Sequence, residues 1–369
     1  MTGKIYDFAI IGAGMAGASI GAELASHASV IVLEAEDAPG YHSTGRSAAF
    51  WEECYGGPDI VPLTLASGRY LREHGFLTDR GALYIGRDED REALDQFMAA
   101  FAGTGVTIER LDREALLQRV PRLRDEWCDA IWEPACADID VAGLHQHYLK
   151  ALKQKGGGLA CRQRVSAIRK DGDVWTVANA LGETFTARTL VNAAGAWADD
   201  TARLASVEPI GIAPFRRTVA QLRVDPPAAS DQPLVLDISG RFYFKPDGGR
   251  LWLSPHDEIP SAPCDAAPEE IDVAHVIDRF ETVTDWRIEA VERRWAGLRS
   301  FAPDRLPVYG YDPQIEGFFW FAGQGGFGIQ TAPAAARLAS QIALGRPPDD
   351  LTREIEPHLY SPARFRKQH

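Results

Sequence analysis

Residues 12–17 read GAGMAG and follow directly on the apolar run YDFAII of residues 6–11, which predicts a buried strand. The alanine-rich residues 18–27 predict a helix, and residues 29–33 predict a second strand that ends at Glu34. A Gly-x-Gly-x-x-Gly loop between a strand and a helix, with an acid at the end of the next strand, is typical of a dinucleotide site. The glycines allow a tight turn and a close approach to a pyrophosphate, while Glu34 can accept hydrogen bonds from the ribose. The predicted loop residues are Gly12, Ala13, Gly14, Met15, Ala16 and Gly17.

The bulk composition excludes several classes of protein. The chain has 369 residues, 45% of them hydrophobic, which suits two domains with sizeable cores. A formal net charge of −13 argues against a nucleic-acid partner. The odd number of cysteines, five and none in a CxxC pair, predicts a reducing, cytoplasmic compartment. We find no signal peptide and no apolar stretch long enough to span a membrane, although peripheral contact with the inner membrane stays open.

The order of predicted elements indicates an interleaved α/β protein. Strands are predicted at 165–168, 174–177, 184–187, 190–192 and 318–322, and helices at 94–101, 141–152, 271–283 and 331–344. Residues 213–297 otherwise alternate as strands do. We therefore predict a Rossmann-like cofactor domain formed by residues 1–80, 138–212 and 298–369. A substrate domain, α+β and built on a mostly antiparallel sheet, would comprise residues 81–137 and 213–297.

Several longer strings carry a resemblance to a known family. They are PGYHSTGRSAA (39–49), ADID (137–140), VNAAGAW (191–197), WAGLRS (295–300) and GGFGIQ (325–330). Together with the GAGMAG loop, they resemble the D-amino-acid oxidase and glycine oxidase superfamily of FAD flavoproteins over essentially the whole chain. Within that superfamily, the sequence is most similar to D-amino-acid dehydrogenases of the bacterial D-arginine dehydrogenase type.

The resemblance implies FAD as the cofactor. Backbone N–H groups of a late glycine-rich turn that opens a helix can stabilise negative charge on a reduced flavin. In related sarcosine and glycine-type enzymes a cysteine can attach the flavin, but residues 298–304 contain none, so we expect non-covalent FAD. Beyond the first loop and Glu34, the implied cofactor residues are Ser43, Thr44, Arg46, Ser47, Val165, Ala194, Gly195, Trp197, Arg299, Gly325, Gly326, Gly328, Ile329 and Gln330.

The same resemblance implies a site for an amino-acid substrate. Arg217, Arg299 and Tyr243 match residues that hold the substrate carboxylate, for which a planar guanidinium is well suited. Tyr55 matches a second pocket tyrosine, and the carbonyl of Gly326 matches the acceptor for the amine. Gln330 would hydrogen-bond to flavin or substrate. The alternative for each arginine is an internal salt bridge, for example to Asp237 or Asp304.

Two departures from the family pattern bear on the substrate. Phe50 replaces a histidine, and Ala82 replaces the glutamate that pairs with a cationic side chain. We therefore expect a neutral or hydrophobic D-amino acid, although Glu52 and Glu53 could restore an acidic contact. His256 is a candidate pocket base. His145 and His147 lie two apart on a helix and diverge, so no metal site is predicted.

These residues predict oxidative deamination of a D-amino acid to a 2-oxo acid and ammonia, by hydride transfer from Cα to flavin N5. The alternatives are a glycine or sarcosine type of secondary amine oxidase, a 2-hydroxy-acid oxidoreductase, and an FAD-binding subunit without turnover. The electron acceptor, a quinone or oxygen, and the oligomeric state stay open.

Overall fold

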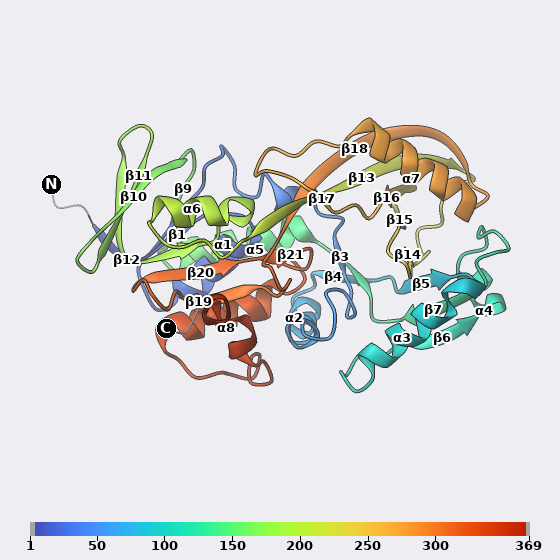
Figure 1. Cartoon of the computed structure of the whole chain (residues 1–369), viewed down its shortest axis with the longest axis horizontal. Coiled ribbons are helices and arrows are strands. Elements are labelled where there is room, and N and C mark those ends of the chain that lie inside the picture. Colours follow the sequence, from blue (N-terminus) through green and yellow to red (C-terminus); the bar gives the residue numbers. More distant parts are fainter. Residues whose placement is uncertain (1–3, 367–369) are drawn as a thin grey trace.

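Two large β-sheets organise the computed structural model, which describes residues 4–366. Figure 1 shows the first sheet in the left half of the molecule and the second in the right half. The strands of the first sheet are β1 (Ile5–Ile11), β2 (Val30–Leu33), β9 (Gly158–Ala160), β10 (Val165–Asp171), β11 (Val174–Asn179), β12 (Thr184–Asn192), β19 (Val308–Tyr311) and β20 (Phe318–Ala322). All of the predicted strands in this list are therefore present, and the two predicted at 184–187 and 190–192 are one continuous strand.

The first sheet is the Rossmann-like part of the fold. Its parallel strands are β9, β2, β1, β12 and β20, with β10, β11 and β19 antiparallel at the edges. The central strands are buried on both faces: Ala9 and Ile10 are fully covered, as are all five residues of β20. Continuous apolar runs are the composition that a parallel sheet covered on both faces requires.

The glycine loop joins β1 to helix α1 (Met15–Leu24). The helix begins three residues earlier than predicted, because the loop turns directly into its first turn. Gly12 has a φ of +99°, and a Cβ atom there would lie 2.5 Å from the carbonyl oxygen of Ala193. A Cβ at Gly17 would lie 1.8 Å from the carbonyl oxygen of Gly12. Both positions therefore require glycine, as the fingerprint predicts.

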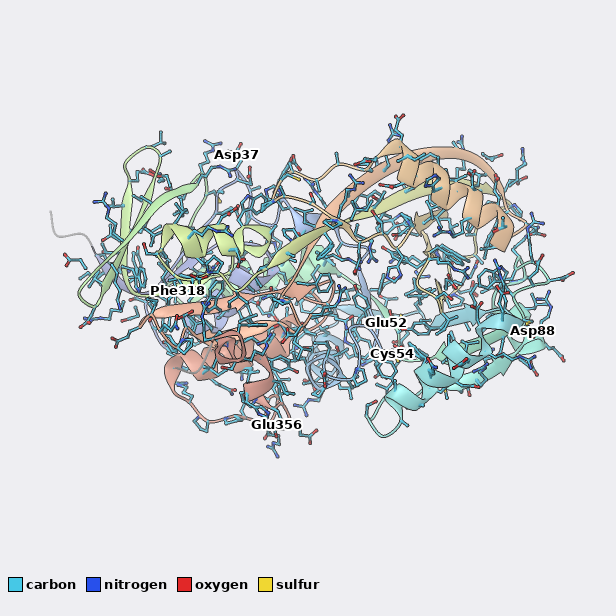
Figure 2. All side chains as sticks on the ribbon, in the orientation of Figure 1. Asp37, Glu52, Cys54, Asp88, Phe318 and Glu356 are labelled. Carbon is cyan, nitrogen blue, oxygen red and sulfur yellow. The ribbon has the colours of Figure 1, made fainter. Side chains whose placement is uncertain are left out.

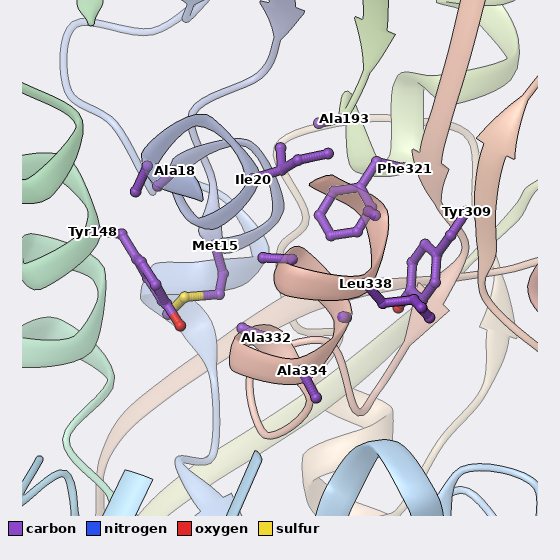
Figure 3. Packing of buried hydrophobic residues seen from close by; sticks show 14 of the residues in the cluster. Met15, Ala18, Ile20, Tyr148, Ala193, Tyr309, Phe321, Ala332, Ala334 and Leu338 are labelled. Carbon is purple, nitrogen blue, oxygen red and sulfur yellow. The ribbon is translucent and has the colours of Figure 1, made fainter. Parts of the chain in front are cut away.

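Three helices cover one face of this sheet. They are α1, α5 (Val141–Gln154) and α8 (Ala332–Leu344), and α1 packs against both of the others. Figure 3 shows Met15, Ile20 and Ala332 meeting in this layer, with Phe321 of β20 beside them. Alanines at the contact let the helices approach closely, which explains the alanine-rich sequences of α1 and α8.

The second sheet is mostly antiparallel and carries the long pair β13 (Ala213–Asp225) and β18 (Arg287–Phe301). This pair extends from the centre of the molecule along the top right of Figure 1. The remaining strands are β5 (Ala82–Gly86), β6 (Glu109–Asp112), β7 (Asp129–Glu133), β14 (Leu234–Asp237), β15 (Tyr243–Asp247), β16 (Arg250–Ser254), β17 (Ile259–Pro260) and β21 (Gln324–Gly325). Helices α3 (Arg91–Phe101), α4 (Arg113–Arg119) and α7 (Glu270–Val283) accompany this sheet. The apolar stripe of α3 is core, as predicted, because Leu94 and Phe101 are buried.

A small third sheet lies between the two large ones. It consists of β3 (Phe50–Trp51), β8 (Ala137–Ile139) and β4 (Leu77–Asp79), and helices α2 (Val61–Glu73) and α6 (Ala198–Leu204) complete the fold. The architecture confirms the predicted α/β class. The exact domain boundaries stay a prediction. Within residues 4–366, no helix is both long and apolar enough to cross a membrane.

Candidate active site

A cavity of about 310 Å³ opens between the two large sheets. Its lining combines the glycine loop and Glu34 of the first sheet with Arg217 and Tyr243 of the second. One continuous space therefore joins the predicted dinucleotide residues to the predicted substrate residues. The other predicted positions in the lining are Ser43, Thr44, Arg46, Ser47, Val165, Ala194, Gly195, Trp197, Arg299, Gly325, Gly326, Gly328 and Ile329.

Glu34 is tied to the glycine loop. One carboxylate oxygen accepts the N–H of Ala13 at 2.9 Å, and the other accepts the N–H of Glu36 at 3.0 Å. Each oxygen keeps a further lone pair, so the buried carboxylate can also accept a ribose hydroxyl. The first turn of α1 has no acidic residue and no cap from its own N-cap residue, Gly14. Apart from the Met15 N–H, which binds Thr44, its N–H groups and its positive end are suited to a pyrophosphate.

The loop after Glu34 closes over the glycine loop. Thr44 Oγ1 accepts the N–H of Met15 at 2.9 Å, and Ser43 Oγ donates to the carbonyl of Leu298 at 2.7 Å. Ser47 Oγ accepts the N–H of Ala49 at 3.0 Å. Arg46 donates to the carbonyl of Ala266 at 2.7 Å and pairs with Asp265. These side chains hold the loop in place, while their residues line the cavity.

Gln330 occupies a different place from the one expected. It is buried and absent from the cavity lining, and its amide is used by the loop that follows β3. Its Nε2 donates to the carbonyl of Glu52 and to Thr64 Oγ1, both at 3.0 Å, and its Oε1 accepts the N–H of Glu52 at 3.2 Å. The side chain therefore positions this loop and does not point to flavin or substrate.

Arg217 is a buried cation with donor capacity to spare. It is 5% exposed, and its Nε donates to the carbonyl of Asp257 at 2.6 Å, while Nη2 lies 3.4 Å from Glu258. Its Nη1 is buried without a partner among the described residues. Burial, and then the charge of Arg299, lower the pKa of Arg217 to about 10, so the group stays charged at neutral pH.

Tyr243 stands beside Arg217 in the cavity wall. The ring is 1% exposed, and the hydroxyl has no hydrogen-bond partner among residues 4–366. Its ring packs edge-on against Phe50, with centroids 5.7 Å apart, and against His256 at 5.7 Å. Buried polar atoms are normally satisfied, so two unpartnered donors on residues that line one cavity indicate a ligand with acceptor oxygens.

Arg299 and Tyr55 form a pair next to these donors. Nη1 of Arg299 donates to the Tyr55 hydroxyl at 2.5 Å. Burial opposes the charge of Arg299, but the nearby Tyr55 and Tyr243 outweigh it, so the pKa of this guanidinium is raised. Gly326 lies against both residues, because a Cβ there would come within 1.8 Å of the Tyr55 hydroxyl. Neither arginine pairs with Asp237 or Asp304, which bind Arg241 and Arg364 instead. The alternative of an internal salt bridge does apply to Arg217, whose guanidinium lies 3.9 Å from the Asp257 carboxylate and 3.4 Å from that of Glu258.

Of the three further pocket candidates, none is part of the cavity lining. Ala82 is fully buried in the core of the second sheet, beside Leu234. Phe50 is half-buried and packs edge-on against Tyr55 and Tyr243. His256 has a φ of +55°, and its Nδ1 lies 3.1 Å from the carbonyl of Gly240. Burial and the two site arginines lower the pKa of His256 to about 3, which makes it a weak base.

Two acidic residues lie near the site: Asp257, which was not assigned a role from sequence, and Glu52, which was expected only as an acidic contact for the substrate. Asp257 holds the main chain beside Arg217, because its carboxylate accepts the N–H and the hydroxyl of Thr218 at 2.7 and 2.9 Å. Glu52 is fully buried near Arg299. No motif marks either residue, although an acid immediately after His256 is a usable signal. Within residues 4–366 no group of His, Cys, Asp and Glu is arranged to hold a metal ion.

The dinucleotide cradle, the second glycine turn and the paired arginines in one cavity define a flavin-dependent oxidoreductase. Comparison with known sequences agrees: the family described as FAD dependent oxidoreductase matches residues 7–342. The chain belongs to this family, and FAD is its cofactor. The adenosine diphosphate half of FAD fits the residues around the glycine loop. These are the positive end of α1, the Glu34 carboxylate, and Gly12 and Gly17, which leave no room for a Cβ atom.

Individual relatives are distant but similar along their whole length. Glycine oxidase from Geobacillus kaustophilus is 27% identical over 377 residues, covering 95% of this chain and 97% of that protein. The crystal structure of L-proline dehydrogenase from P. horikoshii superposes with a TM-score of 0.85 at 23% identity, over 98% of both chains. The structure of L-α-glycerophosphate oxidase from Mycoplasma pneumoniae, solved with FAD bound, superposes with a TM-score of 0.82 at 17% identity, over 93% of this chain and 95% of that one.

Proposed function

We propose that this enzyme oxidises a neutral or hydrophobic D-amino acid to an imino acid, which water converts to a 2-oxo acid and ammonia. The observation that carries the proposal is the set of donors in one cavity: Arg217 Nη1, Tyr243 OH and the Arg299 guanidinium. Two guanidinium groups and a hydroxyl suit a carboxylate, which they would bind in a fixed orientation. The likeness of the sequence to D-arginine dehydrogenases supports the D configuration.

The chain's own residues would supply position and charge. Arg217, Arg299 and Tyr243 hold the carboxylate, Tyr55 orients Arg299, and the carbonyl of Gly326 accepts the substrate amine. FAD, when bound, supplies the acceptor for the hydride that leaves Cα. The amine must first lose its proton. With its low pKa, His256 is poorly suited to take that proton, so we assign the step to water, with Tyr55 nearby.

The preference for an uncharged side chain rests on the residues around the carboxylate site. Phe50 packs edge-on against Tyr243, and Ala82, buried in the same apolar cluster, replaces the glutamate that relatives of the D-arginine type have. A cationic side chain would therefore find no exposed carboxylate in the cavity wall next to Tyr243. Burying it without a partner would be costly.

A glycine or sarcosine type of amine oxidation is the second candidate. It is favoured by the glycine oxidase relative, which is matched over nearly its whole length. The same carboxylate site would serve it. A 2-hydroxy acid is less suitable because it needs a stronger base than His256 provides. A subunit without turnover is disfavoured, because it has no use for buried, unpartnered donors beside the flavin site.

An anaerobic flavin-bleaching screen tests these candidates. The purified holoenzyme is mixed with D- and L-methionine, D-phenylalanine, D-arginine, glycine, sarcosine and 2-hydroxy acids, and flavin absorbance is followed. We expect bleaching by D-methionine or D-phenylalanine and little by D-arginine. Bleaching by sarcosine or glycine alone would replace the proposal with the second candidate. Admitting air afterwards distinguishes an oxygen-reactive oxidase from a dehydrogenase that needs a quinone.

We further propose that FAD is bound without a covalent link. None of the five cysteines, all of them in the described part of the chain, lines the cavity. Acid precipitation should therefore release all of the yellow colour into the supernatant. Colour that stays with the precipitated protein would contradict this proposal.

A further inference from the structure

Glu52 is a buried acid without a partner. It follows β3, and Gln330 clamps its main chain by two hydrogen bonds of 3.2 and 3.0 Å. The side chain is 0% exposed, and neither carboxyl oxygen has a hydrogen-bond partner within residues 4–366. In Figure 2, Glu52 lies near the centre of the molecule, between its two halves. A fixed main chain and a closed environment leave this carboxyl little freedom to find a partner or water.

Five of the other six buried acids within residues 4–366 behave differently. Glu34, Glu133, Asp199, Asp237 and Asp312 each accept hydrogen bonds from a main-chain N–H or from a side chain. A buried carboxyl group without a hydrogen bond lowers the free energy of unfolding, so it destabilises the folded protein. Its retention next to the substrate residues points to a role in the site.

The charged groups around Glu52 come from several elements. Arg299 of β18 attracts its negative form, while Glu133 of β7 repels it. The thiols of Cys54, on the same loop, and of Cys136, before β8, also face the two glutamates. Burial first, and then Glu133, raise the pKa of Glu52, against the opposing effect of Arg299. Within the part of the chain that the structure describes, Arg299 is thus the one cation that acts on this acid.

We propose that Glu52 is a positioning residue whose ionisation is linked to the binding of the substrate carboxylate. Glu52 is neutral when Arg299 holds a carboxylate, and it competes for Arg299 when it ionises. This inference rests on the carboxylate site proposed above. Two negative groups cannot share one buried guanidinium without repulsion, so binding of a carboxylate and retention of the Glu52 proton favour one another. By linkage, the affinity for carboxylates falls as pH rises through the ionisation of Glu52.

The test measures binding of benzoate to the oxidised holoenzyme by the change in the flavin spectrum, from pH 6 to pH 9. Benzoate stays ionised throughout, and Arg217 stays charged because its pKa is about 10. In the wild type we expect the Kd to rise about tenfold over this range, a typical size for coupling between two sites. In Glu52→Gln the Kd should be nearly constant. Titration calorimetry in two buffers should show proton uptake in the wild type only.

Glu53→Gln is the matched control, because this neighbour acts on Glu133 and Arg72 but not directly on Glu52 or Arg299. It should keep the wild-type pH dependence. A pH-independent Kd in the wild type overturns the proposal while leaving the carboxylate site intact. A pH dependence that survives in Glu52→Gln and is lost in Glu133→Gln would place the proton on Glu133 and also overturn it. Failure of benzoate to bind at pH 6 would overturn the carboxylate site itself.

Discussion

Arg299 and Tyr55 are joined by a 2.5 Å hydrogen bond across 244 residues of sequence. The tyrosine arrives on the loop after β3 and the arginine on β18, so the bond ties the small sheet to the second large sheet. Since Gly326 closes the remaining side of the pair, the guanidinium has little freedom to turn away from the cavity. The orientation of Arg299 is therefore set before any ligand arrives.

Tyr55→Phe removes this constraint and should weaken substrate binding. A hydrogen bond to a charged group contributes about 1.5–3 kcal/mol, so we expect kcat/KM to fall about 10- to 100-fold, mainly through KM. Steady-state kinetics with the best substrate of the bleaching screen measure the changes in kcat and KM. Tyr311→Phe is the control, because the Tyr311 hydroxyl bonds to the carbonyl of Ala343, away from the cavity. Equal effects of the two substitutions would exclude a role for the Arg299 bond.

Arg217→Lys should reduce kcat/KM more strongly than Arg216→Lys. Lysine cannot reproduce the planar donor pair of Arg217, and we expect a loss of about 100-fold or more. Arg216 is the neighbour on the same strand, but it binds Glu269 and Asp272 of the α7 region, so its replacement should have little effect on turnover. Flavin content should be unchanged in both. Similar kinetic losses in the two variants would contradict the assignment.

Gly12→Ala should cost the protein its FAD, because the added Cβ would overlap the carbonyl oxygen of Ala193 at 2.5 Å. Gly156→Ala is the matched control: its φ of +83° is equally unfavourable for alanine, but no atom lies within 4 Å of its Cβ. We expect both variants to lose about 1 kcal/mol through the backbone, and only Gly12→Ala to lose flavin absorbance. Full flavin occupancy in Gly12→Ala would show that the loop can shift.

Gln330→Leu should release the loop that carries Glu52 and Tyr55. It removes hydrogen bonds to the N–H and carbonyl of Glu52. The carbonyl keeps the N–H of Tyr55 at 3.3 Å, but the buried N–H is left unsatisfied, which should destabilise the protein by about 1–3 kcal/mol. Because Gln330 does not line the cavity, bound flavin should persist while KM rises. Differential scanning calorimetry and kinetics measure the two effects. If Gln330 instead contacts the flavin, Gln330→Leu should alter the flavin absorption spectrum without lowering the stability of the protein.

Glu52→Gln should also change how stability depends on pH. The folded-state pKa of Glu52 lies above its unfolded value, so the unfolded chain releases this proton first as pH rises from about 4.5. Stability is therefore lost progressively until the pH passes the folded-state pKa. The variant should therefore become more stable relative to the wild type on going from pH 5 to pH 8. Urea unfolding at both pH values measures this. An equal difference in unfolding free energy between the variant and the wild type at pH 5 and pH 8 would contradict the prediction.

The fold could be predicted from local sequence because its signals are local. The strand, glycine turn and helix of residues 5–24 lie within one stretch of chain, and apolar runs mark the parallel strands β2, β12 and β20. The short parallel edge strand β9 has no such run and was not predicted. The family likeness added the second glycine turn and the arginines, which the structure brings to one cavity.

The rest of the site depends on partners that sequence spacing does not show. Gln330 was expected at the flavin, but its partners, Glu52 and Thr64, lie more than 260 residues away. Arg216 does face away from Arg217, as strand alternation predicts. The far side of the strand is not open to solvent, because α7 and the residue before it cover Arg216 and supply two carboxylates. The isolation of Glu52 follows from the packing of β7 and β18 around it, which composition does not encode.

The clamp between Gln330 and the loop at Glu52 also has a consequence for biosynthesis. The two residues are 278 positions apart, so the loop is fastened only after most of the chain has left the ribosome. The glycine loop and Glu34 emerge early, but β20 and the late glycine turn emerge with the last fifth of the chain. A nascent chain can therefore shape the adenosine end of the cofactor site well before it can shape the reacting end.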